Sequence, residues 1–196
     1  TLYTKKELEE LSAACREFKL PLYMDGARLI YGLVSKETDV TLQDIAEFCD
    51  IFYIGGTKVG ALFGEAVVIK NPELAQDFRY LIKQNGGMLA KGRLLGLQFD
   101  ALFTDGLYQE ISAHAIAMAE KLRGAFTAKG YTYLAPNRTN QIFVIVPDAH
   151  LAKISEQFEY SYDQRIDATH SCVRFCTSWA TKEENVDSLI RCVEKL

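Results

Sequence analysis

Two short apolar runs in the first third of the chain end abruptly at polar or glycine-rich corners. Leu22–Met24 stops at Asp25-Gly26, and Ile51–Ile54 runs into Gly55-Gly56-Thr57-Lys58. Runs this short and this apolar predict buried strands, and the helical interval between them makes the unit a strand–helix–strand crossover. Because parallel strands open on the same edge of a sheet, where ligands bind, we expect Asp25 and Lys58 to face one crevice.

Helical periodicity surrounds these two strands. A capping-box pattern, Thr4-x-x-Glu7, precedes a helix that should end before Pro21. Its apolar face is predicted to cover the sheet and consists of Leu8, Leu11, Cys15 and Phe18. Short helices are expected near 29–35 and 42–49, the second capped by Thr41. Gly60 and Gly64 then permit a reversal into a strand at 66–69, antiparallel to its predecessor.

The middle of the chain is predicted to be helical. One helix should begin at Asn71-Pro72 and run to Gly86-Gly87, because proline suits the first helical turn. The next is apolar on nearly every side, so we expect it to be buried between domains or against another subunit; its apolar residues are Leu94, Leu95, Leu97, Phe99, Leu102 and Phe103. After Asp105-Gly106, a long helix reaches Gly130, and His114 on its apolar stripe is better interpreted as a packed or interface side chain than as a catalyst.

The last third mixes strands with helices, which indicates a small α+β domain. Strands are predicted at 131–134, at 142–146, and near Tyr160 and Val173, with a helix from about Asp148. The final helix should begin with another capping box, Thr181-x-x-Glu184.

Composition narrows the function classes. The 196 residues carry a net charge of −4 without a Lys/Arg cluster interleaved with aromatic residues, which argues against a nucleic-acid partner. No apolar run approaches the ~18 residues of a membrane span. Five cysteines, mostly inside apolar patterns, indicate a reducing compartment, so the cytoplasm is the expected location. Their spacing, without an evident set of His ligands, predicts no metal site.

Residues near the predicted strand ends and on a late strand have the chemistry of a binding site. Glycines around Lys58 permit close approach of a phosphate-bearing ligand, and a lysine amine can bind a carbonyl cofactor covalently. A buried Asp25 would need a partner. Arg174 shares a strand face with Cys172 and Cys176 and has the planar fork that grips a carboxylate. From the residue pattern alone, two alternatives remain: an ion pair between Asp25 and Lys58, and structural salt bridges for Arg174 and Arg28.

Two motifs are long enough to be specific: Asp25-Gly26-Ala27-Arg28, and Tyr-Ile-Gly-Gly-Thr-Lys-Val-Gly-Ala-Leu-Phe-Gly-Glu-Ala over 53–66. They resemble the pyridoxal-phosphate (PLP) enzymes of fold type I, in particular the low-specificity threonine aldolase and β-eliminating lyase family. The resemblance runs through to Val173–Thr177. It implies an α/β fold: the C-terminal part of the large PLP-binding domain with a mostly parallel sheet over 1–85, interdomain helices over 86–128, and a small α+β domain over 129–196.

The resemblance also implies roles for individual residues. Lys58 is expected to form the Schiff base with pyridoxal 5′-phosphate, and Asp25 to pair with the pyridine nitrogen. Arg174 and Arg28 are expected to bind the α-carboxylate of an amino-acid substrate, and Thr57, beside the lysine, is a candidate to hydrogen-bond the cofactor phosphate.

One departure and one missing segment limit the resemblance. Many family members carry, directly after Gly-Gly-Met, an arginine that reaches a neighbouring subunit's phosphate, whereas this chain has Leu89 there. Lys91 or Arg93 is the candidate replacement. The family's phosphate loop and cofactor-stacking histidine have no counterpart here, so we expect them in an N-terminal segment of the same protein, and we expect a homodimer or homotetramer.

The resemblance favours a PLP-dependent aldehyde-lyase that cleaves the Cα–Cβ bond of threonine or allo-threonine to give glycine and acetaldehyde. The alternatives are a β-eliminating lyase or an aminotransferase acting on small amino acids. A non-catalytic α/β domain is a weaker alternative, because Lys58, Asp25 and Arg174 are all present.

Overall fold

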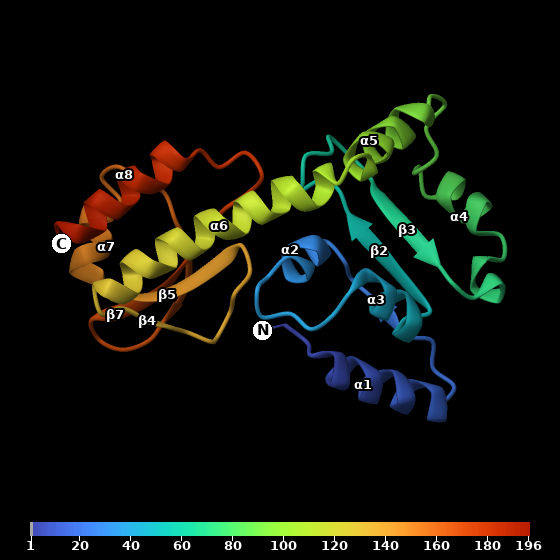
Figure 1. Cartoon of the computed structure of the whole chain (residues 1–196), viewed down its shortest axis with the longest axis horizontal. Coiled ribbons are helices and arrows are strands. Elements are labelled where there is room, and N and C mark those ends of the chain that lie inside the picture. The colour runs from blue at the N-terminus through green and yellow to red at the C-terminus, as the bar shows by residue number, and fades with distance from the viewer. Residues whose placement is uncertain (1) are drawn as a thin grey trace. The chain divides into compact units, whose positions relative to one another are not determined.

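The computed structural model describes residues 2–196 and groups them into two compact units. The N-terminal unit comprises Tyr3–Leu33 and Thr38–Glu110, and the C-terminal unit comprises Leu2, Val34–Glu37 and Ile111–Leu196. Figure 1 labels the elements of both units. The three-part division implied by the sequence stays a prediction.

The N-terminal unit contains a three-stranded sheet in the order β1-β2-β3. Strand β1 (Tyr23–Met24) pairs in parallel with β2 (Ile51–Gly55), and β3 (Glu65–Ile69) returns antiparallel beside β2. The helices are α1 (Lys5–Glu17), α2 (Leu29–Leu33), α3 (Leu42–Phe48), the 3₁₀ helix η1 (Pro72–Ala75), α4 (Phe78–Gln84) and α5 (Arg93–Phe103). The predicted crossover and the antiparallel third strand are therefore confirmed.

Side-chain caps fix where α1 and α3 begin. Thr4 and Glu7 form the predicted capping box at α1, and Thr41 forms another with Asp44 at α3. These contacts satisfy backbone N–H groups that the first turn of a helix leaves unbonded. An ion pair between Lys5 Nζ and Asp44 Oδ1, 2.6 Å apart, then links the two helices.

The hydrophobic core of the N-terminal unit lies on one face of its sheet. Phe52 of β2 belongs to a buried cluster with Leu8 of α1 and Phe48 of α3. The alternate side chains of each strand point away from this core, so Tyr23 is 58% exposed and Val67 is 47% exposed. The prediction of buried strands thus holds for one face only, because α1 and α3 both pack on the Phe52 side.

Two helical predictions for this unit need correction, and a third stays open. The expected apolar face of α1 leaves Leu11 and Phe18 exposed. The helix expected from Asn71 to Gly87 is broken by Asp77, whose left-handed φ of 58° separates η1 from α4. Helix α5 buries Leu102 and leaves three large apolar side chains exposed in the single chain, Leu94, Leu97 and Phe103, so its burial against another domain or subunit stays a prediction.

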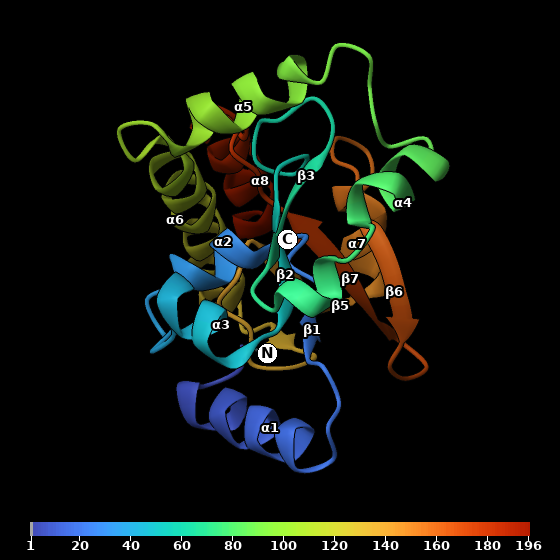
Figure 2. The same ribbon diagram turned by 90° about the vertical axis from the view of Figure 1, so that its right-hand side faces the viewer.

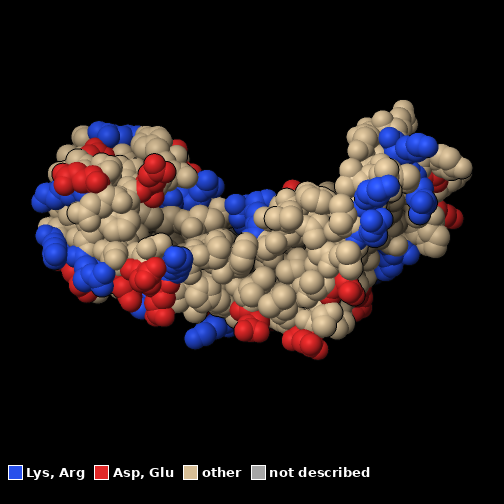
Figure 3. All heavy atoms as spheres, turned by 90° about the horizontal axis from the view of Figure 1, so that it is seen from above, with Lys and Arg blue, Asp and Glu red and all other residues tan. Residues whose placement is uncertain are grey.

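The α4–α5 region is also basic. Four exposed cations lie in the segment 78–93, which contains no acidic residue: Arg79, Lys83, Lys91 and Arg93. Figure 3 shows Lys and Arg gathered at its right-hand end, over this region, whereas the face of the C-terminal unit seen there mixes both signs of charge.

The C-terminal unit confirms the predicted α+β domain. Its antiparallel sheet has the order β4-β5-β7-β6, with β4 at Thr132–Tyr133, β5 at Gln141–Pro147, β6 at Ser161–Arg165 and β7 at His170–Cys176. The helices are most of α6 (Leu107–Ala128), then α7 (Asp148–Ile154) and α8 (Glu183–Glu194). Buried residues of all three helices join those of β5 and β7 in one cluster, which includes Phe126, Val144, Leu151, Val173 and Val186. The helices therefore cover one face of this sheet (Figure 2).

The capping box predicted at Thr181 is wrong. The residue at the N-cap of α8 is Lys182, and its side chain makes no capping hydrogen bond. Thr181 Oγ1 instead accepts a hydrogen bond from the Ser178 N–H at 2.8 Å, so the loop before the helix uses the hydroxyl that the helix was expected to use. Within residues 2–196, no helix combines the length and apolar character needed to cross a membrane.

Candidate active site

The corners after β1 and β2 are held together by their backbones. The Gly55 N–H donates to the Gly26 carbonyl at 3.0 Å. A Cβ at Gly26 would collide with the Tyr53 carbonyl oxygen, and one at Gly55 would collide with the Ala27 carbonyl. Both glycines are therefore needed for this close approach. The predicted convergence of the two corners is what the parallel pairing of β1 and β2 produces.

Asp25 is exposed, and not buried as expected, because it lies on the sheet face that α1 and α3 do not cover. Its Oδ1 accepts hydrogen bonds from the Tyr53 hydroxyl and from the Ala27 N–H, the latter at 3.0 Å. The Tyr53 contact, followed by the Ala27 contact, lowers the pKa of Asp25, and the positive charges of Lys58 and Arg28 act in the same direction. The shared hydrogen bond also raises the pKa of Tyr53 to about 12. The carboxylate is thus held ionised.

Lys58 is half-buried just beyond β2. Its backbone is fixed, since its carbonyl accepts a hydrogen bond from the Tyr31 hydroxyl at 2.7 Å and the following residue, Val59, is fully buried. Among residues 2–196, no carboxylate lies within 4.0 Å of the Lys58 amine, so the Asp25–Lys58 ion pair considered from the sequence is not formed. The amine therefore remains available to a ligand.

Thr57 has a different neighbour from the one expected. Its Oγ1 donates to Glu65 Oε1 at 3.0 Å, and the other oxygen of Glu65 accepts from the Gly56 N–H. A phosphate oxygen would need the same donor hydrogen, and Glu65 would repel it. Thr57 as a phosphate ligand stays a prediction, and it requires Glu65 to release the hydroxyl.

Arg28 lies immediately before α2 and is half-buried. Its Nε is buried without a hydrogen-bond partner in the described part of the chain. An orphaned buried N–H of a cation is costly, and a bound anion would satisfy it. Asp25, Arg28, Thr57 and Lys58 all belong to the N-terminal unit.

Arg174 belongs to the C-terminal unit, on β7. As the alternation predicted, Val173 and Phe175 enter the hydrophobic core and Arg174 points to the opposite face. Its Nη1 donates to Gln141 Oε1 at 3.3 Å, its Nη2 to Ser161 Oγ at 3.4 Å, and its Nε has no partner among residues 2–196. It has no carboxylate within 4.0 Å in this part of the chain, so the structural salt bridge considered for it is not formed.

The sequence interpretation missed the side chains that surround these groups. Tyr53, Glu65 and Gln141 contact Asp25, Thr57 and Arg174 respectively. The signal for Tyr53 lies in the strand register, which places it after Phe52, the partner of Met24, and so beside Asp25. The sequence alone does not give that register.

The histidines have structural partners. The ring of exposed His114 donates to the Thr181 carbonyl at 2.8 Å, and the His150 ring bonds the Tyr131 hydroxyl at 2.8 Å. Residues 2–196 contain no group of three or more side chains placed to hold a metal ion.

A family model described as beta-eliminating lyase matches residues 1–149. The chain belongs to the beta-eliminating lyase family. Members of this family depend on pyridoxal 5′-phosphate. The resemblance inferred from the two motifs is thereby confirmed.

Two relatives match nearly the whole length of this chain. A low specificity L-threonine aldolase from Pseudomonas sp. is 30% identical over 190 residues, which are 96% of this chain and 54% of that protein. A solved structure of threonine aldolase from Leishmania major is 41% identical, with a TM-score of 0.96, over 98% of this chain and 56% of that one. The chain thus spans about half the length of the relatives that it matches.

More distant structures share the fold alone. Serine palmitoyltransferase from Sphingomonas wittichii is 15% identical with a TM-score of 0.66, covering 96% of this chain and 50% of that one. These neighbours confirm the predicted fold class, that of PLP-dependent fold type I enzymes.

The residues of the N-terminal unit fit the family's cofactor. Asp25 offers an ionised carboxylate whose Oδ2 accepts no hydrogen bond from residues 2–196. Lys58 offers an amine without an ion-pair partner there, and Arg28 an orphaned N–H. A PLP site needs a carboxylate that accepts a hydrogen bond from the ring nitrogen, an amine that binds the cofactor, and an N–H group that donates to an anion.

Proposed function

We propose that the protein carrying this chain is a PLP-dependent lyase that cleaves the Cα–Cβ bond of β-hydroxy amino acids, converting threonine or allo-threonine to glycine and acetaldehyde. The observation that carries the proposal is the placement of Asp25 and Lys58 after two parallel, paired strands, in a chain of the beta-eliminating lyase family. The names of its relatives, low specificity L-threonine aldolases, support this reaction over others.

Each candidate residue has one task in this proposal. Lys58 would hold the cofactor through its amine, Asp25 would accept a hydrogen bond from the ring nitrogen, and Thr57 would bind the phosphate. Bound PLP supplies a sink for the electron pair that is released at the substrate's Cα. Arg174 and Arg28 would bind the α-carboxylate.

The carboxylate contact decides which bond breaks. An arginine fork that fixes the α-carboxylate also fixes the directions of the other bonds at Cα. In the proposed reaction the β-hydroxyl loses its proton, the Cα–Cβ bond breaks to release acetaldehyde, and Cα takes up a proton to give glycine. Arg174, helped by Arg28, would therefore control both binding and the choice of reaction.

A β-eliminating lyase is the second candidate, because the matching family is described by that activity. An aminotransferase acting on small amino acids is the remaining enzymatic alternative. Product analysis with the cofactor-loaded protein separates the three. We expect L-threonine or L-allo-threonine to give glycine and acetaldehyde in equal amounts, and Lys58→Ala to abolish this, while the exposed Lys70→Ala does not. Pyruvate and ammonia from serine, or amino transfer to a 2-oxo acid, with threonine left intact, would contradict the proposal.

We also infer a homodimer or homotetramer. The exposed Leu94, Leu97 and Phe103 of α5 support it, because apolar side chains gathered on one helix are typical of subunit contacts. Sedimentation of the active protein should show an oligomer, and an active monomer would contradict this inference.

We place the protein in the cytoplasm. All five cysteines are free, which is typical of a reducing compartment: Cys15, Cys49, Cys172, Cys176 and Cys192. Cell fractionation followed by immunoblotting tests the location, and recovery outside the cytosolic fraction would overturn it.

A further inference from the structure

We propose that Gln141 is a positioning residue: it holds the Arg174 guanidinium by a neutral contact, so that the cation keeps its charge for a substrate carboxylate. This inference rests on the proposed role of Arg174 in the lyase reaction and extends it to a residue that the sequence did not suggest.

Arg174 is set between two neighbouring strands. It lies on β7, which pairs with β5 on one side and β6 on the other, opposite Phe143 and Ser161. Gln141 of β5 and Ser161 of β6 each accept one hydrogen bond from its terminal nitrogens, at 3.3 Å and 3.4 Å. Both acceptors are uncharged, so they orient the guanidinium without neutralising it.

Three of the four other arginines of the C-terminal unit are held differently, and the fourth, Arg191, is exposed and bonds the Ser188 hydroxyl at 2.8 Å. Arg123, Arg138 and Arg165 each pair with a carboxylate, at 3.0, 2.9 and 2.7 Å respectively. Arg174 is half-buried, yet no such pair forms within the described residues, and its Nε has no hydrogen-bond partner among them. A partly buried cation without a counter-ion is costly, and a bound anion would relieve that cost.

Space for a small ligand lies beside the guanidinium. Arg174 lines a cavity of about 380 Å³ together with Ser161, Cys176 and Thr177. This volume is within the range of small-molecule sites. Glu159 also lines the cavity but forms no ion pair with Arg174 among residues 2–196.

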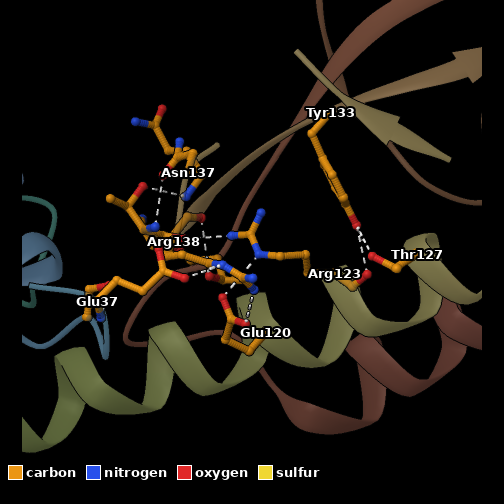
Figure 4. Close-up of polar contacts among 12 residues, drawn as sticks. Glu37, Glu120, Arg123, Thr127, Tyr133, Asn137 and Arg138 are labelled. Carbon is orange, nitrogen blue, oxygen red and sulfur yellow. Dashed lines mark hydrogen bonds and ion pairs between the residues drawn. The ribbon is translucent and has the colours of Figure 1, made fainter. Parts of the chain in front are cut away.

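Gln141 is itself held firmly by the loop that precedes it. Arg138 bridges Glu37 and Glu120 at 2.9 and 3.0 Å, and the Thr139 carbonyl accepts from buried Arg123 at 3.3 Å. Figure 4 shows these side chains converging on the loop.

The residue immediately before Gln141 adds a further anchor. Asn140 is buried, and its Nδ2 donates to the Thr177 carbonyl at 2.7 Å, which ties the start of β5 to the end of β7. The amide of Gln141 is thus presented from a fixed backbone, as a positioning residue requires.

Two substitutions of Gln141 separate the effect of an added charge from the effect of a lost hydrogen-bond acceptor. Gln141→Glu keeps the size of the side chain but supplies Arg174 with a permanent carboxylate partner, against which a substrate carboxylate must compete. Gln141→Met keeps the length and removes the acceptor without adding charge. Gln157→Glu adds the same charge at an exposed position of the same unit and serves as the control.

The test measures binding to the cofactor-loaded protein by the change in visible absorption. Two ligands are compared: glycine, which has an α-carboxylate, and ethanolamine, which does not. We expect Gln141→Glu to raise the Kd for glycine by about tenfold or more and to leave that for ethanolamine within about twofold. Gln141→Met should have a smaller effect in the same direction, and Gln157→Glu none.

The outcomes distinguish this inference from the function on which it rests. If Arg174→Lys weakens glycine binding but Gln141→Glu does not, or if Gln141→Glu weakens both ligands equally, Gln141 is not a positioning residue. If Arg174→Lys itself leaves glycine binding unchanged, the carboxylate role of Arg174 fails, and this inference with it. If threonine is not cleaved but glycine binding behaves as expected, the proposed reaction fails while the role of Gln141 stands.

Discussion

The two sheets of this chain hold their candidate groups in different ways. In the N-terminal unit, Asp25 and Lys58 follow the ends of strands, and backbone contacts between Gly26, Gly55 and their neighbours fix the two corners. In the C-terminal unit, Arg174 lies within a strand, and side chains from both neighbouring strands fix it.

The surroundings of the two sheets differ as well. Helices α6, α7 and α8 bury one face of the C-terminal sheet around Phe126 and Val173, whereas the N-terminal sheet leaves Tyr23 and Val67 about half exposed. The first site should therefore be sensitive to backbone changes. The second should be sensitive to side-chain changes around a well-packed core.

The largest effect is expected in the core of the C-terminal unit. Phe126 is fully buried, with its ring centroid 5.3 Å from that of Phe175. Phe126→Ala should lower the free energy of unfolding by about 3–5 kcal/mol, because it removes contacts and leaves a cavity. Phe103→Ala, at an exposed position of α5, should cost much less if nothing covers that helix. Denaturant unfolding measures both, and equal losses would show that α5 is buried in the assembled protein.

A backbone change at Gly26 should be nearly as damaging. Gly26→Ala places a methyl group against the Tyr53 carbonyl, so we expect a loss of about 3 kcal/mol in the free energy of unfolding, together with weaker cofactor binding. Gly124→Ala is the matched control, because a Cβ there meets nothing within 4 Å. That substitution, inside α6, should stabilise the helix by about 0.5–1 kcal/mol. A harmless Gly26→Ala would contradict the account of the corner.

A side-chain change at Arg174 should affect activity more than stability. Arg174→Lys keeps the charge but loses the planar fork, so kcat/KM for threonine should fall roughly 10- to 100-fold. Arg165→Lys, in the neighbouring strand β6, is the control, since Arg165 pairs with Asp148 of its own unit at 2.7 Å. Steady-state kinetics would reject the assignment if the two variants behaved alike.

The smallest effect concerns the ion pair between α1 and α3. Contacts with Lys5 and Thr41, Lys5 first, lower the pKa of Asp44 to about 2. The pKa is below its unfolded value, so this contribution to stability is present above about pH 4 and is lost as the pH falls towards 2. Asp44→Asn should remove that part of the acid dependence of unfolding, whereas Glu17→Gln, at the exposed end of α1, should retain it. An unchanged pH profile in Asp44→Asn would contradict the contact.

Much of the fold follows from local sequence patterns. The capping box at Thr4 and the alternation that turns Arg174 away from the core are set by residues close in sequence. The proximity of the two corners follows from two local strand patterns and the rule that a crossover makes them parallel. The break at Asp77 and the missing cap at Thr181 were not predictable in this way. Local signals were compatible with a helix in both places. The left-handed backbone of Asp77 breaks the first helix, and the hydrogen bond from the Ser178 N–H occupies the Thr181 hydroxyl before the second.

The sequence motifs predicted the candidate residues of the site but not the side chains that contact them. Asp25 and Lys58 end apolar runs and are visible in the sequence, but their contacts come from elsewhere. Tyr53 meets Asp25 through strand pairing, Glu65 meets Thr57 across a reversal, and Gln141 meets Arg174 across 33 residues. Strand register determines such contacts, and no local pattern records it.

The central claim is that Lys58 holds the cofactor, and borohydride reduction of the cofactor-loaded protein tests it most directly. Reduction fixes the cofactor to the lysine that carries it, and peptide mapping by mass spectrometry then identifies that residue. The account predicts the added mass on the peptide containing Lys58 and its absence in Lys58→Ala. Labelling of another lysine, such as Lys70 or Lys91, or of none, would contradict the claim.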